Sequence, residues 1–216
     1  MKFDAVLFDC DGVLVDSESI TCGVLRDMLE ERGWAMALQQ CMEIFVGHAV
    51  TDKRGEIEAH TGQPITQEWL LAFRERRNVA LVADIQAIPN VHAAVKAVHL
   101  SMNGRIACAS GADRFKVEMM LTQVGLIDYF AGNIFSGHEM PRSKPHPDVY
   151  LAAAAHLGMD PTRCAVVEDT IVGVRAGVSA GATVFGYAPL GDGQALLDAG
   201  ASVVFRDMAE LPGLMN

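Results

Sequence analysis

Two aspartates separated by a single residue follow an apolar segment near the start of the chain. Residues 3–8 are mostly apolar, and Asp9, Cys10, Asp11 and Gly12 come directly after them. Residues i and i+2 of an extended chain point to the same side, so both carboxylates leave the segment together. Two carboxylates that lie close together resist ionising unless a cation or a shared proton neutralises them. This spacing predicts a divalent metal site, an acid–base pair, or both.

Three later segments carry further polar residues at the ends of predicted strands or in the loops between them. They are Ser110 with Gly111, the loop around Lys144, and Glu168 with Asp169. Acidic residues from separate loops suit Mg²⁺, which prefers oxygen ligands. A hydroxyl at the start of a helix suits a phosphate, and a lysine offers a compact positive charge to phosphate oxygens.

The elements that must position these residues alternate regularly along most of the chain. Predicted strands cover residues 3–8, 105–109, 133–135, 164–167, 182–187 and 202–205. Helical patterns separate them, starting near residue 113 and covering residues 148–157 and 170–180. Strict alternation of this kind predicts a doubly wound, Rossmann-like parallel sheet with right-handed crossovers. In such a sheet the carboxyl ends of the strands line one crevice, so the polar residues above are expected to meet there.

A purely helical stretch interrupts this alternation. From Ser17 to about residue 84 the apolar residues recur at helical spacing, and no convincing strand pattern is present. The stretch begins after one strand and ends before the next. We therefore expect an α/β core formed by residues 1–15 and 86–216, with residues 16–85 inserted as a small α-helical cap domain.

Composition restricts the classes of partner. The 216 residues carry a formal net charge of −10, which argues against non-specific nucleic-acid binding. No apolar stretch reaches the length of a membrane span, so no membrane association is expected. The five cysteines are odd in number and contain no C-x-x-C pair, which indicates reduced thiols and a cytoplasmic location. The sequence leaves a monomer and a homodimer equally open.

The four polar segments resemble, in order, the four motifs of the haloacid dehalogenase superfamily. The matching residues are 9–18, 109–111, 143–147 and 167–170. The ordered set spans most of the chain, and an insertion directly after the first motif is similar to the subgroup with a small helical cap. The resemblance implies a phosphoric monoester hydrolase that uses Mg²⁺ and an aspartyl-phosphate intermediate.

The resemblance also implies roles for individual residues. Asp9 would be the nucleophile, and Asp11 would protonate the leaving alcohol and then activate water. Lys144 would hold Asp9 and bind the phosphoryl group together with Ser110 and Gly111. The metal would be held by four residues: Asp9, Asp11 through its backbone carbonyl, Asp169, and Glu168 in or near the coordination shell.

In the predicted cap, Gly47 and His48 are the candidates for contacting the substrate. The glycine could bring the backbone close to a ligand, although His48 could equally be an exposed loop histidine. Substrate choice is expected to depend on such cap residues.

The family resemblance also indicates a substrate class and two alternative functions. An aspartate at position 11 points to phosphate esters, since the dehalogenases of the superfamily lack it. The resemblance is to bacterial phosphatases of sugar or sugar-acid phosphates. A phosphosugar mutase of the β-phosphoglucomutase type is an alternative, but Thr21 and Val50 stand where mutases carry a histidine and a basic residue. A non-catalytic binding protein is a second alternative, which the presence of Asp9, Asp169 and Lys144 disfavours.

Overall fold

The computed structural model describes residues 3–215 and divides into two compact units. One unit contains the chain up to Asp16 and from Gln86 onward, and the other contains Ser17–Ile85.

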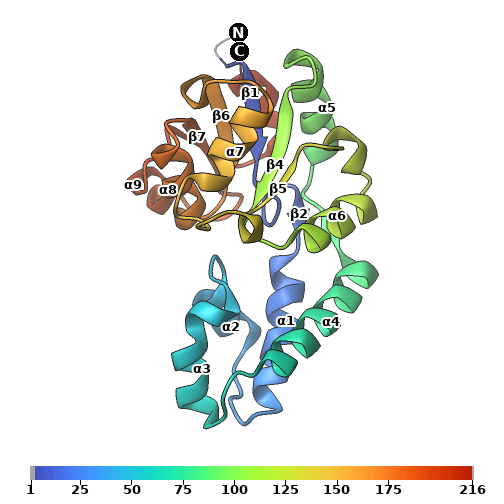
Figure 1. The fold of residues 1–216 in the computed structure, drawn as a ribbon, viewed down its shortest axis with the longest axis vertical. Helices are drawn as coiled ribbons and strands as arrows, with labels where there is room; N and C mark the ends of the chain where they lie inside the picture. Colours follow the sequence, from blue (N-terminus) through green and yellow to red (C-terminus); the bar gives the residue numbers. More distant parts are fainter. Residues whose placement is uncertain (1–2, 216) are drawn as a thin grey trace. The chain divides into compact units, whose positions relative to one another are not determined.

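The first unit is built on a six-stranded parallel sheet in the order β5-β4-β1-β6-β7-β8 (Figure 1). The strands are β1 (Ala5–Phe8), β4 (Ile106–Ser110), β5 (Ile134–Ser136), β6 (Cys164–Glu168), β7 (Thr183–Tyr187) and β8 (Val203–Phe205). Strands β4 and β5 follow one another on one side of β1, and strands β6, β7 and β8 follow one another on the other side. A crevice for a ligand forms at such a switch point in strand order. The predicted doubly wound parallel sheet is confirmed.

Helices cover both faces of this sheet. They are α5 (Val91–Ser101), α6 (Arg114–Gln123), α7 (Asp148–His156), α8 (Ile171–Ser179), α9 (Gln194–Asp198) and α10 (Leu211–Leu214). Figure 1 shows α7 and α8 on one side of the sheet and α5 and α6 on the other.

The central strand β1 is buried on both of its faces, as a strand between two helical layers must be. Ala5 and Leu7 belong to the apolar cluster that includes Tyr150 of α7. The ring of Phe8 instead packs edge-on against Phe130, with the ring centroids 5.8 Å apart. Burying both faces fixes the position of β1, and so the position of the aspartates that follow it.

The register of the sheet brings the strand ends to one edge. Phe8 lies opposite Cys108 of β4 and opposite Val167 of β6. The residues after these three therefore emerge side by side. Asp9, the Ser110 end of β4 and the Glu168 end of β6 meet at this edge because the register aligns them.

A short antiparallel ribbon marks the two points where the chain leaves and re-enters the first unit. It pairs β2 (Val15–Asp16) with β3 (Gln86–Ala87). Two residues are too few to show an alternating pattern, so the sequence did not predict it.

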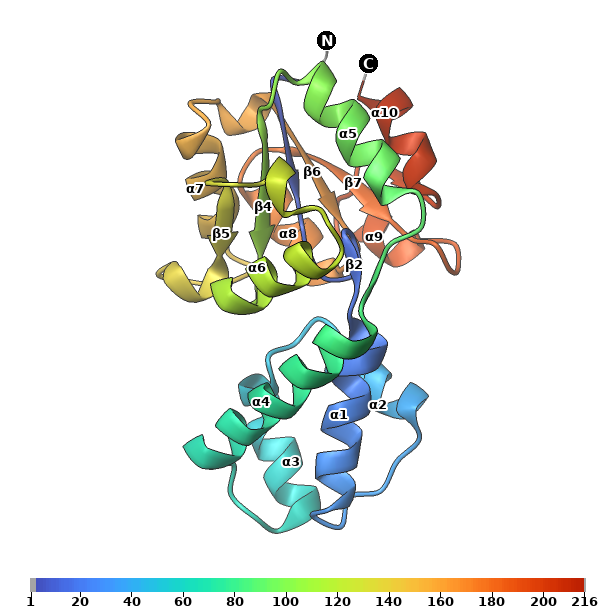
Figure 2. The same cartoon turned by 90° about the vertical axis from the view of Figure 1, so that its right-hand side faces the viewer.

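The second unit is helical. It contains α1 (Glu18–Glu30), α2 (Leu38–Phe45), α3 (Arg54–Thr61), α4 (Gln67–Asp84) and a single turn of 3-10 helix at Val50–Lys53, and α1 lies alongside α4 (Figure 2). Its own apolar cluster includes Leu25, Leu29, Phe45 and Trp69. Residues 17–85 form no strand, as the sequence predicted. Within residues 3–215, no helix combines the length and the apolar character that crossing a membrane requires.

Candidate active site

Three charged side chains from separate segments meet at the carboxyl end of the sheet. The Nζ of Lys144 donates to Oδ1 of Asp9 at 2.8 Å and to Oε1 of Glu168 at 2.6 Å. All three side chains are largely shielded from solvent, with exposed fractions of 10% or less. One lysine therefore links the end of β1 to the end of β6 in a poorly solvated site.

Burial and the lysine act in opposite directions on Asp9. Burial raises the pKa of Asp9 to about 7, and the positive charge of Lys144 only partly offsets this. Burial by itself would lower the pKa of Lys144, but the carboxylates of Asp9 and Glu168 outweigh it and hold the pKa well above its usual value. Lys144 is therefore charged, and Asp9 gains its negative charge only near neutral pH.

Glu168 is held by donors on both of its oxygens. Its Oε1 accepts from Lys144 and from the hydroxyl of Tyr150, the latter at 2.6 Å. Its Oε2 accepts from the backbone N–H groups of Asp169 and Thr170 and from the hydroxyl of Thr170, at 3.1–3.3 Å. A carboxylate has about four lone-pair sites, so these five donors occupy all of its capacity. Glu168 is suited to orienting Lys144.

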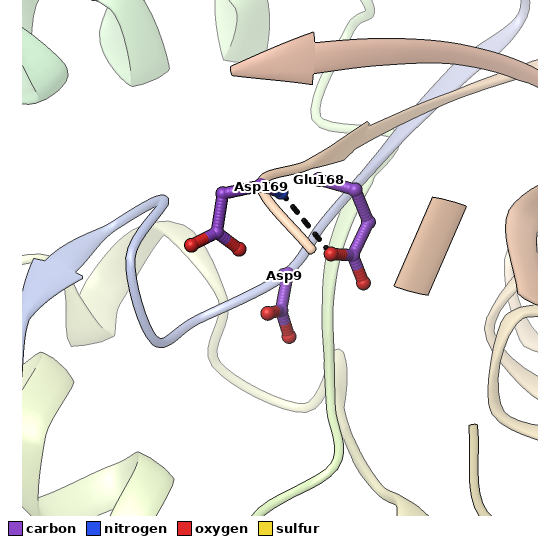
Figure 3. A group of neighbouring side chains, drawn as sticks. All are labelled: Asp9, Glu168 and Asp169. Carbon is purple, nitrogen blue, oxygen red and sulfur yellow. Dashed lines mark hydrogen bonds between the residues drawn. The ribbon is translucent and has the colours of Figure 1, made fainter. Parts of the chain in front are cut away.

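A group of three carboxylates could hold a metal ion. Asp9, Glu168 and Asp169 each offer a carboxylate oxygen, and these oxygens lie within 4.8 Å of one another. Figure 3 shows the three side chains next to one another. Gly12 has a φ of 74°, and a Cβ there would lie 1.9 Å from Oδ2 of Asp169. Only glycine leaves room for the Asp169 carboxylate in this position.

Asp11 lies outside this group, and its side chain pairs with a different lysine. The Nζ of Lys116 lies 2.5 Å from Oδ1 of Asp11. The Asp11 side chain is 22% exposed, whereas that of Lys116 is 8% exposed. The two aspartates of the first motif are therefore held by two different lysines.

Ser110 is buried at the end of β4, in a loop fixed by hydrogen bonds. Its hydroxyl accepts from the N–H of Ala112 at 3.0 Å, and the hydroxyl of Ser136 donates to the carbonyl of Ala112 at 2.7 Å. Gly111 and Gly137 lie close to the hydroxyl of Ser143. The loop that follows β4 is therefore tied to β5, and Ser110 and Gly111 lie on the same edge of the sheet as Asp9.

Gly47 and His48 lie elsewhere in the chain. Both belong to the helical unit, in the segment between α2 and the 3-10 turn, and Gly47 has a φ of 78°. Their predicted contact with the substrate stays a prediction.

Sequence reasoning missed three side chains of this network: Lys116, Tyr150 and Thr170. Lys116 looks like an ordinary helical lysine, and Tyr150 looks like an ordinary core residue. The hydroxyl of Thr170 also caps α8 by accepting from Gly173, which a polar residue before a helix does indicate. No spacing in the sequence identifies the other two.

The fold and the cluster of carboxylates and lysine are those of an α/β protein with a buried, metal-compatible candidate active site. A family model of haloacid dehalogenase-like hydrolases matches residues 3–181. The chain belongs to this family.

Relatives and solved structures agree with that family. Hexitol phosphatase B of Escherichia coli (strain K12) is 32% identical over 180 residues, covering 82% of this chain and 79% of its own. The 6-phosphogluconate phosphatase of the same organism is 26% identical, covering 85% and 82%. A crystal structure of a HAD family hydrolase from Deinococcus radiodurans R1, with bound phosphate and sodium, is 34% identical. It has a TM-score of 0.78 and covers 97% of this chain and 93% of its own. The chain is thus an enzyme, and its named relatives support phosphatase activity.

Proposed function

We propose that this protein is a Mg²⁺-dependent phosphatase that hydrolyses a small phosphorylated metabolite through an aspartyl-phosphate intermediate. The observation that carries the proposal is the contact between Lys144 and Asp9 inside the acidic group. A buried carboxylate that an ammonium group holds in place at the edge of the sheet has the arrangement of a positioned nucleophile.

In the proposed reaction Asp9 is the nucleophile, and Asp11 is the general acid and then the general base. A carboxylate oxygen of Asp9 bonds to phosphorus while the bond from phosphorus to the ester oxygen breaks. Asp11 gives that oxygen a proton, so the alcohol leaves neutral. Water then attacks phosphorus and passes a proton to Asp11 as the bond to Asp9 breaks, which releases inorganic phosphate and restores both carboxyl groups.

The phosphoryl group is proposed to bind between Ser110, Gly111 and Lys144. The hydroxyl of Ser110 and the backbone of the rigid loop after β4 offer hydrogen-bond donors, and Lys144 offers charge. Since Glu168 accepts from Lys144, it fixes where that charge lies. Most of the rate enhancement in phosphoryl transfer comes from positioning and electrostatics of this kind.

The donor set fits Mg²⁺, because carboxylate oxygens are its preferred protein ligands. Asp9 and Asp169 are proposed to hold it, with Glu168 at the edge of the coordination shell and the backbone carbonyl of Asp11 contributing. When bound, Mg²⁺ would reduce the repulsion between the Asp9 carboxylate and the phosphate dianion.

A sugar or sugar-acid phosphate is the proposed substrate class. Relatives named for hexitol phosphate and 6-phosphogluconate hydrolysis support it. Gly47 and His48 of the helical unit are proposed to contact the sugar portion, with residues 16–85 acting as a cap. The five buried free cysteines support a cytoplasmic location. Nucleic acids and membranes are not proposed partners, and the enzyme is a monomer or a homodimer.

The decisive experiment is inorganic phosphate release from a panel of esters, with Mg²⁺ and with EDTA. The panel contains 6-phosphogluconate, phosphoglycolate, hexose 6-phosphates, β-glucose 1-phosphate and nucleotides. We expect metal-dependent release, strongest with a sugar or sugar-acid phosphate, and none from the Asp9→Asn variant. Isomerisation of a sugar phosphate without phosphate release would establish a mutase instead, and a folded protein inert to every ester would favour a binding role.

A further inference from the structure

Lys116 is a buried lysine in the α/β unit that the proposed reaction does not use. It lies in the first turn of α6 and is 7% exposed, and its Nζ lies 2.5 Å from Oδ1 of Asp11. Lysine is almost never buried without a partner, because desolvating an ammonium group is costly. The burial of Lys116 is therefore tied to its contact with Asp11.

The start of α6 is fixed from two directions, so the amine of Lys116 is presented at a defined place. The side chain of Asp113 caps the helix by accepting from the backbone N–H of Lys116 at 3.0 Å. Arg114 makes a two-pronged contact with the carboxylate of Glu139, at 2.6 and 2.7 Å. The helix end that carries Lys116 is thus attached to the segment that follows β5.

Asp11 stands where the chain turns after the central strand, and Lys116 donates to its carboxylate. It follows the end of β1 and precedes Gly12, and it lies outside the group formed by Asp9, Glu168 and Asp169. A short carboxylate side chain has several rotamers of similar energy. The hydrogen bond from Lys116 favours the rotamer that turns Oδ1 toward its amine.

We propose that Lys116 is a positioning residue that holds the carboxyl group of Asp11 in place for its proton transfers. The inference rests on the proposed function, in which Asp11 protonates the leaving alcohol and then receives a proton from water. In this proposal Lys116 acts through Asp11, and Lys144 meets the charge of the phosphoryl group. Lys144 therefore orients the nucleophile Asp9, and Lys116 orients the acid–base residue Asp11.

This role has a signature that separates it from simple support of the fold. An alkyl phosphate has a poor leaving group that must be protonated as it departs, whereas p-nitrophenol leaves without help. A misplaced Asp11 therefore slows the alkyl ester more than the aryl ester. Loss of general support would slow both equally.

The test compares kcat and KM of Lys116→Met and Lys116→Arg on two substrates. One is p-nitrophenyl phosphate, and the other is the sugar phosphate that the unaltered protein hydrolyses best. We expect Lys116→Met to lower kcat on the sugar phosphate about 100-fold, the lower range for general acid–base catalysis, with little change in KM. Its effect on the aryl ester should be about tenfold smaller. Lys116→Arg should recover most of the lost activity, because it keeps a charged donor. Lys96→Met, which removes an exposed lysine from α5, is the matched control and should change neither substrate.

A double variant completes the test. If Lys116 acts through Asp11, adding Lys116→Met to Asp11→Asn causes no further loss on the sugar phosphate. Equal losses on both esters, or additive losses in the double variant, would overturn the inference while leaving the phosphatase proposal intact. If the unaltered protein hydrolyses neither ester, the proposed function fails and the role of Lys116 fails with it.

Discussion

The Nζ of Lys144 lies 2.8 Å from Oδ1 of Asp9, although 135 residues separate the two in the chain. Lys144 also contacts Oε1 of Glu168, so one ammonium group is shared by two buried carboxylates. Removing one partner from such a cluster leaves an uncompensated charge in a poorly solvated site.

Lys144→Met is expected to abolish turnover and to lower the stability of the folded protein. The loss of stability should be about 3 kcal/mol or more, because Glu168 is fully buried and loses its charged donor. Urea unfolding followed by circular dichroism measures this, with Lys96→Met as the matched surface control. An unchanged unfolding midpoint would show that Glu168 does not depend on Lys144 for its charge balance.

Mg²⁺ binding is expected to weaken as the pH falls below about 7. The pKa of Asp9 is raised to about 7 by burial, so below that pH the carboxyl group carries a proton that the cation must displace. Above that pH the group is ionised and affinity should level off. Calorimetric titration at pH 6, 7 and 8, in buffers of different ionisation enthalpy, measures both the affinity and the proton release. Affinity that stays constant from pH 6 to 8 would contradict Asp9 as a ligand that titrates in this range.

Mg²⁺ is also expected to raise the thermal unfolding temperature of the protein. A ligand that binds only the folded state stabilises it in proportion to the logarithm of its concentration. Asp169→Asn should remove this effect, because it replaces a carboxylate of the acidic group by a neutral amide. Asp128→Asn, at an exposed position, is the matched control and should keep the full shift. An equal Mg²⁺-dependent shift in Asp169→Asn and the unaltered protein would exclude Asp169 as a ligand.

Gly173→Ala is expected to displace the buried carboxylate of Glu168 and so to disturb the candidate active site. A Cβ at this position would lie 1.8 Å from Oε1 of Glu168, so the buried carboxylate or α8 must move. Overpacking of this kind costs about 1–3 kcal/mol. Displacing Glu168 should also weaken its hydrogen bond with Lys144, and kcat should fall as a result.

The control for this variant is Gly55→Ala on α3, where a Cβ meets nothing within 4 Å. Gly55 is exposed in the first turn of α3, so alanine there should be slightly stabilising, by less than the ~0.5–1 kcal/mol expected in the middle of a helix. The two substitutions should therefore change the unfolding midpoint in opposite directions. A neutral Gly173→Ala would show that Glu168 can relax without cost.

The strands and the site motifs could be predicted because their signals are local. The apolar run before Asp9 predicts a buried strand, and β1 ends at Phe8. The segment ending at Glu168 shows the same pattern. Parallel pairing then brings such strand ends to one edge, which is why residues as distant as Asp9 and Asp169 could be expected together.

The pairing of Lys116 with Asp11 and of Tyr150 with Glu168 was decided only by the tertiary structure. Lys116 and Asp11 are 105 residues apart, and their contact depends on how α6 is rotated and where its first turn is anchored. Tyr150 reaches Glu168 only because α7 packs its buried face on the sheet. The sequence determines which chemical groups reach the edge of the sheet, because strand patterns and their terminal residues are encoded locally. Side-chain pairing depends on packing between segments that are distant in the chain, so the folded core alone determined that Lys116 would pair with Asp11, whereas the family resemblance had already implied the contact of Lys144 with Asp9.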